Sequence, residues 1–401
     1  MQLNSEVLGK IEYLTGSADI AEKLPVVCAR APFDDVIVEY LNDVSKKLMG
    51  NRAAKVYSDV VTFAFWIRKG SVLKLKERFY ENKGIYLGKG VAFHIAPSNV
   101  PVNFAYSLVA GLLTGNANVV RVPSKDFPQI RIITSALNDA AEDYPELKPY
   151  VLCVRYERDQ EINDLFSSVA DMRVVWGGDQ TITELRKSTL PPRSGEITFA
   201  DRYSIAVIDS DSYMVTDDKT KVAENFYNDT FFSDQNACTS PRIIVWMGSK
   251  IEEAKNVFWA EEHKIVEKKY TFQSIQGVNK LTKAFLIAAQ EPGIRVKEHH
   301  DNLIIRVSVP EITERLMDYR DNSGYFYEYD CEDIMDLVPL CNDKRCQTIG
   351  YIGDGNVILP LIQSGIKGID RVVPIGKTMD FDLIWDGYNL PAMMTRTIVI
   401  A

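Results

Sequence analysis

The stretch SDQNACTSPRIIVW, residues 233–246, places a single cysteine, Cys238, in a polar, turn-prone segment just ahead of an apolar run. A cysteine nucleophile reacts as its thiolate, so it needs partial exposure and positive or dipolar surroundings. Neighbours such as Asp234, Asn236 and Arg242 suit an exposed turn. Free cysteine is also among the most buried residue types, so Cys238 could equally be a small side chain of the core. The local sequence leaves both interpretations open.

A second polar group stands in APSNVPVNF, residues 96–104, where Asn99 lies between Pro97 and Pro101. The segment is typical of a turn from a strand to a helix, and the two prolines stiffen it. A rigid amide donor can stabilise the oxyanion that develops during acyl transfer. The alternative is that Asn99 merely caps the helix that follows.

A glycine pair, Gly177 and Gly178, ends the apolar run MRVVWGG and precedes the helical pattern DQTITELRKS. A strand, two glycines and a helix in this order expose backbone N–H groups at a helix N-terminus, where a phosphate can bind. Paired glycines after a strand also occur in simple tight turns. The pair therefore favours a phosphate site only in combination with other signals.

The elements that must position these residues alternate between strands and helices. We predict strands over 90–98, 118–124, 150–156 and 172–178, with helices over 102–115, 126–144 and 159–169 between them. Such a βαβα order builds a parallel sheet that is covered by helices. The sequence therefore predicts an α/β protein.

A second α/β region begins near residue 205. We predict strands over 204–209, 242–248, 302–310 and 347–354, and helices over 219–232 and 250–270. Cys238 lies on the connection between the helix 219–232 and the strand 242–248. The tail MTRTIVIA, residues 394–401, is rich in β-branched residues and is predicted to add an edge strand to its own sheet or to that of a neighbouring subunit.

Composition excludes several classes of protein. The chain has 401 residues, a length typical of two or three domains, and its 46% hydrophobic and 25% charged residues are ordinary for a globular protein. The formal net charge of −9 and the absence of a dense Lys/Arg block argue against a nucleic-acid partner. The least polar long stretch, residues 100–120, contains Pro101, Asn103, Asn116 and Asn118, so we expect no membrane span.

The six cysteines contain no CxxC pair, which favours a reducing, cytoplasmic compartment. No secretory signal is visible at the N-terminus of the sequence. Cys341 and Cys346 could be combined with His299 and His300 as metal ligands, but their spacing matches no usual zinc pattern. We therefore expect no metal site.

Three segments together resemble the aldehyde dehydrogenase superfamily. PSNVP resembles its Pro-aromatic-Asn-Phe-Pro turn, GNANVVRVPS its Gly-Asn strand that ends in Lys-Pro-Ser, and DQNACTSPR its catalytic cysteine loop. More specifically, the chain resembles the LuxC-type fatty acyl-CoA reductases in VVWGGDQTI (174–182), QTIGYIGD (347–354) and GIDRVVPIGKTMDFDLIWDGYNL (368–390). The resemblance runs from about residue 85 to the C-terminus.

This resemblance implies an aldehyde dehydrogenase-like fold. A Rossmann-type cofactor domain with N-terminal helices would span 1–204, a catalytic α/β domain with Cys238 would span 205–375, and a segment 376–401 could supply an oligomerisation strand. It further implies that Cys238 accepts the acyl group and that Asn99 forms the oxyanion hole with the backbone N–H of Cys238. The cofactor would bind near Ser124, Lys125, Gly177 and Gly178, with its pyrophosphate at the glycine pair.

Two departures from the superfamily bear on cofactor and chemistry. The adenosine-side lysine of the superfamily falls on Val122, and the acidic residue three positions later falls on Lys125. A cation at that point favours a ribose 2′-phosphate, so we expect NADPH rather than NADH. The glutamate that activates water in hydrolytic members falls on Phe199, and an acyl-cysteine without a positioned base resists hydrolysis. Asp201 lies nearby in sequence but suits an exposed turn.

The resulting expectation is NADPH-dependent reduction of an acyl thioester, acyl-CoA or acyl-protein, to an aldehyde through an acyl-cysteine. A homo-oligomer and an acyl-activating synthetase partner are expected by likeness to the family. One alternative is a CoA-acylating aldehyde dehydrogenase that acts on a small aldehyde. Another is a non-catalytic scaffold of the same fold. The acyl group itself cannot be read from the sequence.

Overall fold

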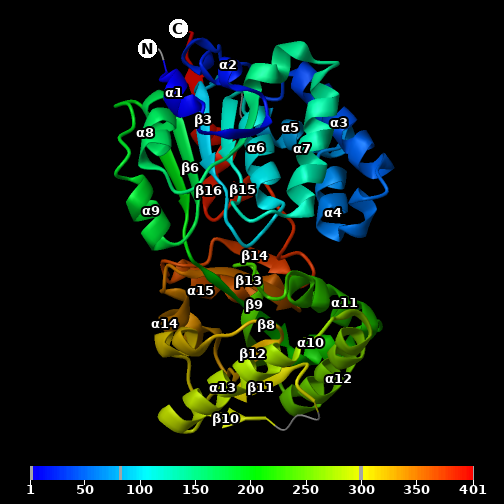
Figure 1. The fold of residues 1–401 in the computed structure, drawn as a ribbon. Coiled ribbons are helices and arrows are strands. Elements are labelled where there is room, and N and C mark those ends of the chain that lie inside the picture. The colour runs from blue at the N-terminus through cyan, green and yellow to red at the C-terminus, as the bar shows by residue number, and fades with distance from the viewer. Residues whose placement is uncertain (1–2, 81–83, 298–300, 401) are drawn as a thin grey trace. The chain divides into compact units, whose positions relative to one another are not determined.

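The computed structural model describes residues 3–80, 84–297 and 301–400. Its contacts divide the chain into two compact units (Figure 1), a first unit of Met1–Ala200 with Phe381–Ala401 and a second unit of Asp201–Asp380. Residues 376–380 thus lie in the second unit, and 381–401 lie in the first. The functional division into 1–204, 205–375 and 376–401 stays a prediction.

The first unit is built on a six-stranded sheet with the order β1-β5-β4-β3-β6-β7. The strands are β1 (Glu12–Thr15), β3 (Val91–Ile95), β4 (Ala117–Arg121), β5 (Val151–Arg155), β6 (Met172–Trp176) and β7 (Gly195–Phe199). Strands β3 to β7 run parallel, and β1 pairs antiparallel with β5. Every residue of β3 and β6 is buried, as expected for parallel strands covered on both faces.

Helices connect the parallel strands of the first unit, as the sequence predicts. The connecting helices are α6 (Asn103–Leu113), α7 (Pro128–Ala141), α8 (Gln160–Val169) and α9 (Asp179–Leu185). The N-terminal region adds α1 (Ser5–Leu8), α2 (Ala18–Ala21), α3 (Asp35–Gly50), α4 (Ser58–Trp66) and α5 (Lys69–Tyr80), and the short 3-10 helices η1 (Leu24–Val26), η2 (Ala54–Val56) and η3 (Pro145–Tyr150). In α3 the buried Ile37, Leu41, Val44 and Leu48 recur every three or four residues, so one face of the helix packs on the core.

The C-terminal residues complete the first unit. Strand β17 (Thr395–Ile398) pairs antiparallel with β2 (Ile85–Gly88), so the tail adds a strand to a ribbon of its own chain. The preceding residues form the hairpin of β15 (Ile384–Trp385) and β16 (Tyr388–Asn389) and the helix α16 (Leu390–Met394). The amide of Asn116 donates to the carbonyl of Met394 at 3.0 Å, which ties the tail to the first unit.

The second unit contains a seven-stranded sheet with the order β10-β11-β12-β9-β8-β13-β14. Its strands are β8 (Tyr203–Asp209), β9 (Pro241–Met247), β10 (Arg295–Val296), β11 (Ile305–Ser308), β12 (Tyr325–Asp330), β13 (Cys346–Ile352) and β14 (Arg371–Pro374). Its helices are α10 (Ser210–Val215), α11 (Lys219–Asp229), α12 (Ile251–Lys269), α13 (Ser274–Gln290), α14 (Val338–Cys341) and α15 (Leu359–Gln363), with the 3-10 helices η4 (Phe231–Ser233), η5 (Glu314–Tyr319), η6 (Ile334–Leu337) and η7 (Gly355–Ile358). All pairs are parallel except β10 with β11.

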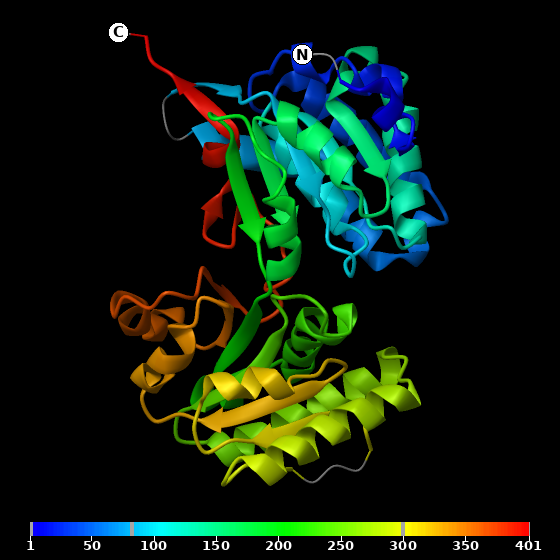
Figure 2. The same ribbon diagram turned by 60° about the vertical axis from the view of Figure 1, so that its left-hand side comes forward.

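Two hydrophobic cores lie on opposite faces of this second sheet. Figure 2 shows the sheet with the helices that pack against it. In β8, Ile205 and Val207 belong to one core while Ala206 and Ile208 belong to the other, because successive side chains of a strand point to opposite faces. Helices α11 and α12 cover one face, and α13, α14 and α15 cover the other. The α/β fold predicted from the sequence is confirmed.

Among the described residues, no helix is both long and apolar enough to cross a lipid bilayer.

Candidate active site

Cys238 lies on the loop between α11 and β9 in the second unit, at the position that the sequence predicts. Its side chain is partly exposed, whereas Cys153, Cys331, Cys341 and Cys346 are buried. Burial raises the pKa of the Cys153 thiol to about 12, so that group stays protonated at neutral pH. Only Cys28 is more exposed than Cys238. Partial exposure meets the first requirement of a cysteine nucleophile.

The cysteine loop, residues 230–240, is held by a buried amide. Gln235 is fully buried, and its Nε2 donates to the carbonyls of Pro241 at 3.0 Å and Tyr325 at 3.1 Å. Its Oε1 accepts from the backbone N–H groups of Gly324 at 3.0 Å and Tyr325 at 3.1 Å. An amide side chain has two donors and two acceptor sites, so Gln235 is fully satisfied. It fixes the loop to the start of β9 and of β12.

Three further hydrogen bonds hold the loop. The carboxylate of Asp234 accepts from Ser323 Oγ at 2.8 Å and from the hydroxyl of Tyr270. Asn322 donates to Asn236 Oδ1 at 2.7 Å. Asp234 and Gln235 both have positive φ, +53° and +56°, which costs free energy and persists only where contacts impose it. These contacts therefore fix the backbone conformation of the loop that carries Cys238.

Arg242 places a buried positive charge beside this loop. Its Nη2 donates to the carbonyl of Gln235 at 2.9 Å and its Nη1 to that of Asp321 at 2.7 Å. Burial, reinforced by Arg320, lowers the pKa of Arg242 to about 10, and a negative charge on Cys238 acts in the opposite direction. Arg242 remains a cation at neutral pH and lies close enough to Cys238 for the two groups to interact electrostatically.

Asn99 lies in the first unit, on the turn between β3 and α6, and is exposed. Helix α6 begins at Asn103 and has Val102 at its N-cap, so the alternative that Asn99 caps this helix is wrong. The turn follows the carboxyl end of β3, which is the central strand of the first sheet. Its role as an oxyanion donor stays a prediction.

Gly177 and Gly178 form the bend between β6 and α9. Strands β3 and β6 are neighbours, but the chain leaves β3 in one direction to β4 and β5 and returns on the other side to β6 and β7. Doubly wound sheets bind ligands at such a switch point, outside the carboxyl ends of the strands. A Cβ added at Gly178 would have no atom within 4 Å, so the bend leaves open space for a ligand.

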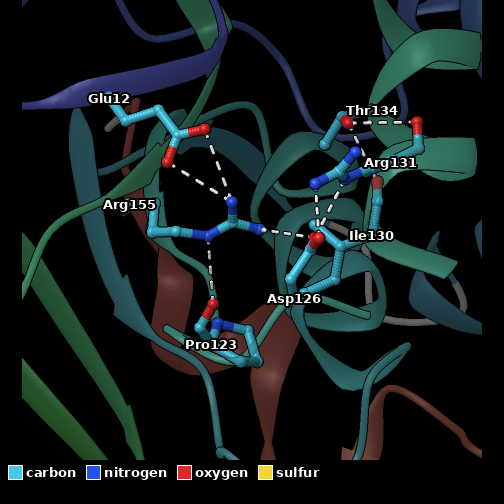
Figure 3. A network of polar contacts seen from close by, with 7 residues as sticks. All are labelled: Glu12, Pro123, Asp126, Ile130, Arg131, Thr134 and Arg155. Atoms are coloured by element: carbon cyan, nitrogen blue, oxygen red, sulfur yellow. Dashed lines mark hydrogen bonds and ion pairs between the residues drawn. The ribbon is translucent and has the colours of Figure 1, made fainter. Parts of the chain in front are cut away.

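Ser124 and Lys125 are exposed on the loop that follows β4. The Nζ of Lys125 lies 4.8 Å from the ring centroid of Phe127. Asp126, the next residue, would by its charge oppose a 2′-phosphate. Figure 3 shows that two guanidinium groups meet this carboxylate.

In this network Arg131 Nε donates to Asp126 Oδ1 at 2.9 Å, and Arg155 Nη2 lies 3.8 Å from the same oxygen. Arg155 also pairs with Glu12 at 3.3 Å and donates to the carbonyl of Pro123 at 3.3 Å. The two arginines balance the charges of Asp126 and Glu12. Lys125 is therefore a cation of the loop after β4 for which the described residues supply no ion-pair partner, and its role toward a phosphate stays a prediction.

Phe199, at the position of the superfamily's glutamate, is part of an aromatic cluster. Its ring stacks on Trp176 with centroids 3.6 Å apart and meets the edge of Tyr388 at 5.6 Å. Trp176 donates to Ser107 Oγ at 3.0 Å, and burial lowers the pKa of the adjoining His94 to about 4, so His94 is neutral. This part of the first unit presents rings rather than an ionised base.

Asp201, the other carboxylate near that position in sequence, is exposed and pairs with Arg320 at 2.6 Å. Among the described residues, no group of three His, Cys, Asp or Glu side chains could hold a metal ion. His299 and His300 lie outside the described residues.

Sequence reasoning missed the residues that support the nucleophile. Gln235 and Arg242 stand three residues before and four residues after Cys238, but only the structure shows that their side chains turn inward. A hollow of the second unit was also missed, because its residues come from distant segments. It is lined by Asn279, Thr282 and Lys283 of α13 and by Arg320, Asp321 and Asn322. Asn322 joins this hollow to the cysteine loop.

Comparison with known proteins identifies relatives of this chain. Curated relatives include the long-chain acyl-protein thioester reductases of Aliivibrio fischeri, 24% identical over 294 residues, and Vibrio harveyi, 26% identical over 297 residues. Each match covers 72% of this chain but 58% and 59% of the relative, so the chain spans just under three fifths of their length.

Solved structures show the fold. A NAD-dependent benzaldehyde dehydrogenase from Corynebacterium glutamicum superposes with a TM-score of 0.64 at 14% identity, covering 99% of this chain and 95% of that one. The fold is thus that of the aldehyde dehydrogenases, as predicted. The family model described as acyl-CoA reductase (LuxC) matches residues 71–396. Since this match covers most of the 401 residues, the chain belongs to the LuxC acyl-CoA reductase family.

Proposed function

We propose that this protein reduces an acyl thioester to an aldehyde with NADPH, through an acyl-cysteine on Cys238. The observation that carries the proposal is a partly exposed thiol on a rigid loop beside a buried cation, in a chain of the LuxC acyl-CoA reductase family. The curated relatives are named acyl-protein thioester reductases, which supports an acyl thioester as the substrate class.

In the first half-reaction the Cys238 thiolate attacks the thioester carbonyl carbon. The carbonyl oxygen becomes an oxyanion, for which Asn99 and the backbone N–H of Cys238 are the proposed donors. The tetrahedral species collapses, the C–S bond to the donor breaks, and the donor leaves as a thiol after gaining a proton. One thioester replaces another, so the residues of the site need only lower the barrier.

Residues of the first unit fit a dinucleotide. The open bend at Gly177 and Gly178 would hold the pyrophosphate, and Ser124 and Lys125 would meet the adenosine ribose. When bound, NADPH supplies a hydride for the acyl carbon. Cys238 then leaves as a thiolate when the C–S bond of the acyl-cysteine breaks, and the aldehyde is released.

The absence of a carboxylate at Phe199 supports reduction over hydrolysis. A water molecule attacking the acyl-cysteine would need a base, and general-base assistance is worth about a hundredfold to ten-thousandfold in rate. The stacked rings of Phe199 and Trp176 supply no such base. The acyl-cysteine therefore survives until it is reduced.

The acyl donor and the assembly are also proposals. The names of the relatives favour an acyl-protein donor, loaded by an acyl-activating synthetase, over free acyl-CoA. A homo-oligomer is proposed from the superfamily likeness.

Intact mass measurement tests the nucleophile. The protein is incubated with acyl-CoA of several chain lengths without cofactor, and we expect an adduct of one acyl group that hydroxylamine removes. Cys238→Ser should lose the adduct, while Cys28→Ser, which removes the other exposed thiol, should keep it. Failure of the native protein to form an adduct at any chain length, with acyl-CoA and with an acylated protein donor alike, would exclude the proposal.

A further inference from the structure

The turn of residues 375–380 follows β14 at the centre of the longest segment that resembles the LuxC family. Its backbone is hydrogen-bonded to the sheet, because the N–H of Ile375 donates to the carbonyl of Tyr351 at 3.0 Å. Its carbonyls are held by Arg371, which donates to Thr378 at 3.0 Å and to Asp380 at 3.1 Å. The turn is thus a fixed part of the second unit.

The N–H groups of the turn are held by a buried carboxylate, Asp229. This residue ends α11 and is fully buried. Its Oδ2 accepts from the N–H of Gly376 at 2.5 Å and its Oδ1 from the N–H of Thr378 at 3.2 Å. Gly376 has φ of +92°, and a Cβ there would lie 2.7 Å from Cβ of Asn225, so the close approach of turn and helix requires glycine.

The same turn contacts the residue next to the nucleophile. The hydroxyl of Thr239 donates to the sulfur of Met379 at 3.2 Å. On the other side, the cysteine loop begins directly after Asp229, where the carbonyl of Thr230 accepts from the N–H of Gln235 at 2.9 Å. Asp229, the turn, Thr239 and the cysteine loop therefore form a closed circuit of contacts that passes through the loop containing Cys238.

A negative charge on the buried carboxyl group of Asp229 costs free energy. It is buried at the C-terminal end of a helix, where the helix dipole disfavours negative charge. Burial raises the pKa of Asp229 to about 7, and the charge of Asp380 adds to this effect. Of the other charges facing it, Lys377 is paired with Asp380 at 2.9 Å and Arg371 is engaged with the carbonyls of the turn. A neutral asparagine would avoid this cost, but it could not replace both oxygens of Asp229, each of which accepts one N–H bond, since one of the two terminal atoms of its amide is an NH₂ donor.

We propose that Asp229 is a positioning residue, which couples the 375–380 turn to the cysteine loop and so holds Cys238 in its reacting geometry. The inference rests on the proposed role of Cys238 as the nucleophile. It assigns a function to a residue nine positions upstream that never meets the substrate.

The test compares Asp229→Asn with Asp211→Asn, a carboxylate of the same unit that accepts from the N–H and the hydroxyl of Ser249 and does not contact the loop. Hydrogen exchange is measured in 230–240 and 375–380, and iodoacetamide alkylation of Cys238 is followed by peptide mass from pH 5.5 to 9. Formation of the acyl adduct is timed in parallel. We expect faster exchange in both segments, an altered pH profile of alkylation and acylation slowed about tenfold to a hundredfold in Asp229→Asn. Asp211→Asn should match the native protein.

If Asp229 only stabilised the turn, Asp229→Asn would exchange faster in 375–380, but alkylation and acylation of Cys238 would be unchanged. That result would overturn the inference. If Asp229→Asn does not fold, Met379→Leu breaks the circuit at its other end without removing a charge. Unchanged Cys238 reactivity in Met379→Leu would then overturn it. If the native protein forms no acyl adduct, the proposed function fails, and the alkylation and exchange data still decide whether Asp229 positions the cysteine.

Discussion

The cysteine loop of the second unit and the glycine bend of the first unit are built in opposite ways. In the loop of Cys238, the buried Gln235 satisfies backbone groups at the start of β9 and of β12, and two residues have positive φ. At Gly178 the backbone has ordinary φ of −65°, and the space beside it is open. A nucleophile must be held in a fixed direction, whereas a phosphate needs room and backbone donors. Rigidity is therefore concentrated where the covalent bond is proposed to form.

Gln235→Ala should give the largest effect on stability, because four backbone groups lose their partner in the interior. We expect the free energy of unfolding of the second unit to fall by about 2–4 kcal/mol. Gly178→Ala, in open space at a φ that alanine adopts, should change stability by less than about 0.5 kcal/mol. Urea unfolding followed by hydrogen exchange of each unit measures both. Equal losses in the two variants would mean that the contrast between loop and bend is wrong.

Lys125→Glu tests the charge where the adenosine ribose of the cofactor is proposed to bind. We expect binding of 2′,5′-ADP to weaken about tenfold and binding of ADP to change little, because the substitution repels the 2′-phosphate. Asp126→Asn is the matched control, and it should leave the preference nearly unchanged since Arg131 and Arg155 already neutralise that carboxylate. Calorimetry with both nucleotides gives the ratio of the 2′,5′-ADP affinity to the ADP affinity for each variant. An unaltered ratio in Lys125→Glu would remove the argument for NADPH.

The two units should also respond oppositely to pH. Burial lowers the pKa of His94 to about 4 in the first unit. The contribution of neutral His94 to the free energy of unfolding is therefore present above pH 6.5 and is lost as pH falls toward 4. In the second unit burial raises the pKa of Glu262 well above 4.5. The contribution of protonated Glu262 to the free energy of unfolding is therefore present at low pH and is lost as pH rises.

Glu262→Gln should therefore stabilise the second unit at pH 8 by about 1 kcal/mol and much less at pH 4.5. Thermal unfolding of native and variant proteins across this range is the measurement. Glu253→Gln, an exposed carboxylate on the same helix, is the control. A stabilisation that does not grow with pH would contradict the assigned cause.

Much of the fold follows from local pattern. The strands around β3, β4 and β6 are apolar runs with glycine or proline at their ends, so their positions could be predicted within a few residues. Cys238 and the glycine bend were proposed from short contiguous motifs that resemble the aldehyde dehydrogenase superfamily, and their roles stay predictions. The long-range partners of Gln235, Asp229 and Arg242 lie 90, 147 and 79 residues away in the sequence, respectively. A single sequence has no local signal for such contacts, so the supporting side chains emerged only from the structure.

The pairing of β17 with β2 has a consequence for biosynthesis. Residues 381–401 belong to the first unit, although residues 201–380 are made before them. The six-stranded sheet can assemble early, but β2 and the amide of Asn116 lack their partners in β17 and Met394 until residues 394–398 have been synthesised. The second unit is thus made as an insertion into the first unit, and the first unit is completed only after residues 201–380 have been made.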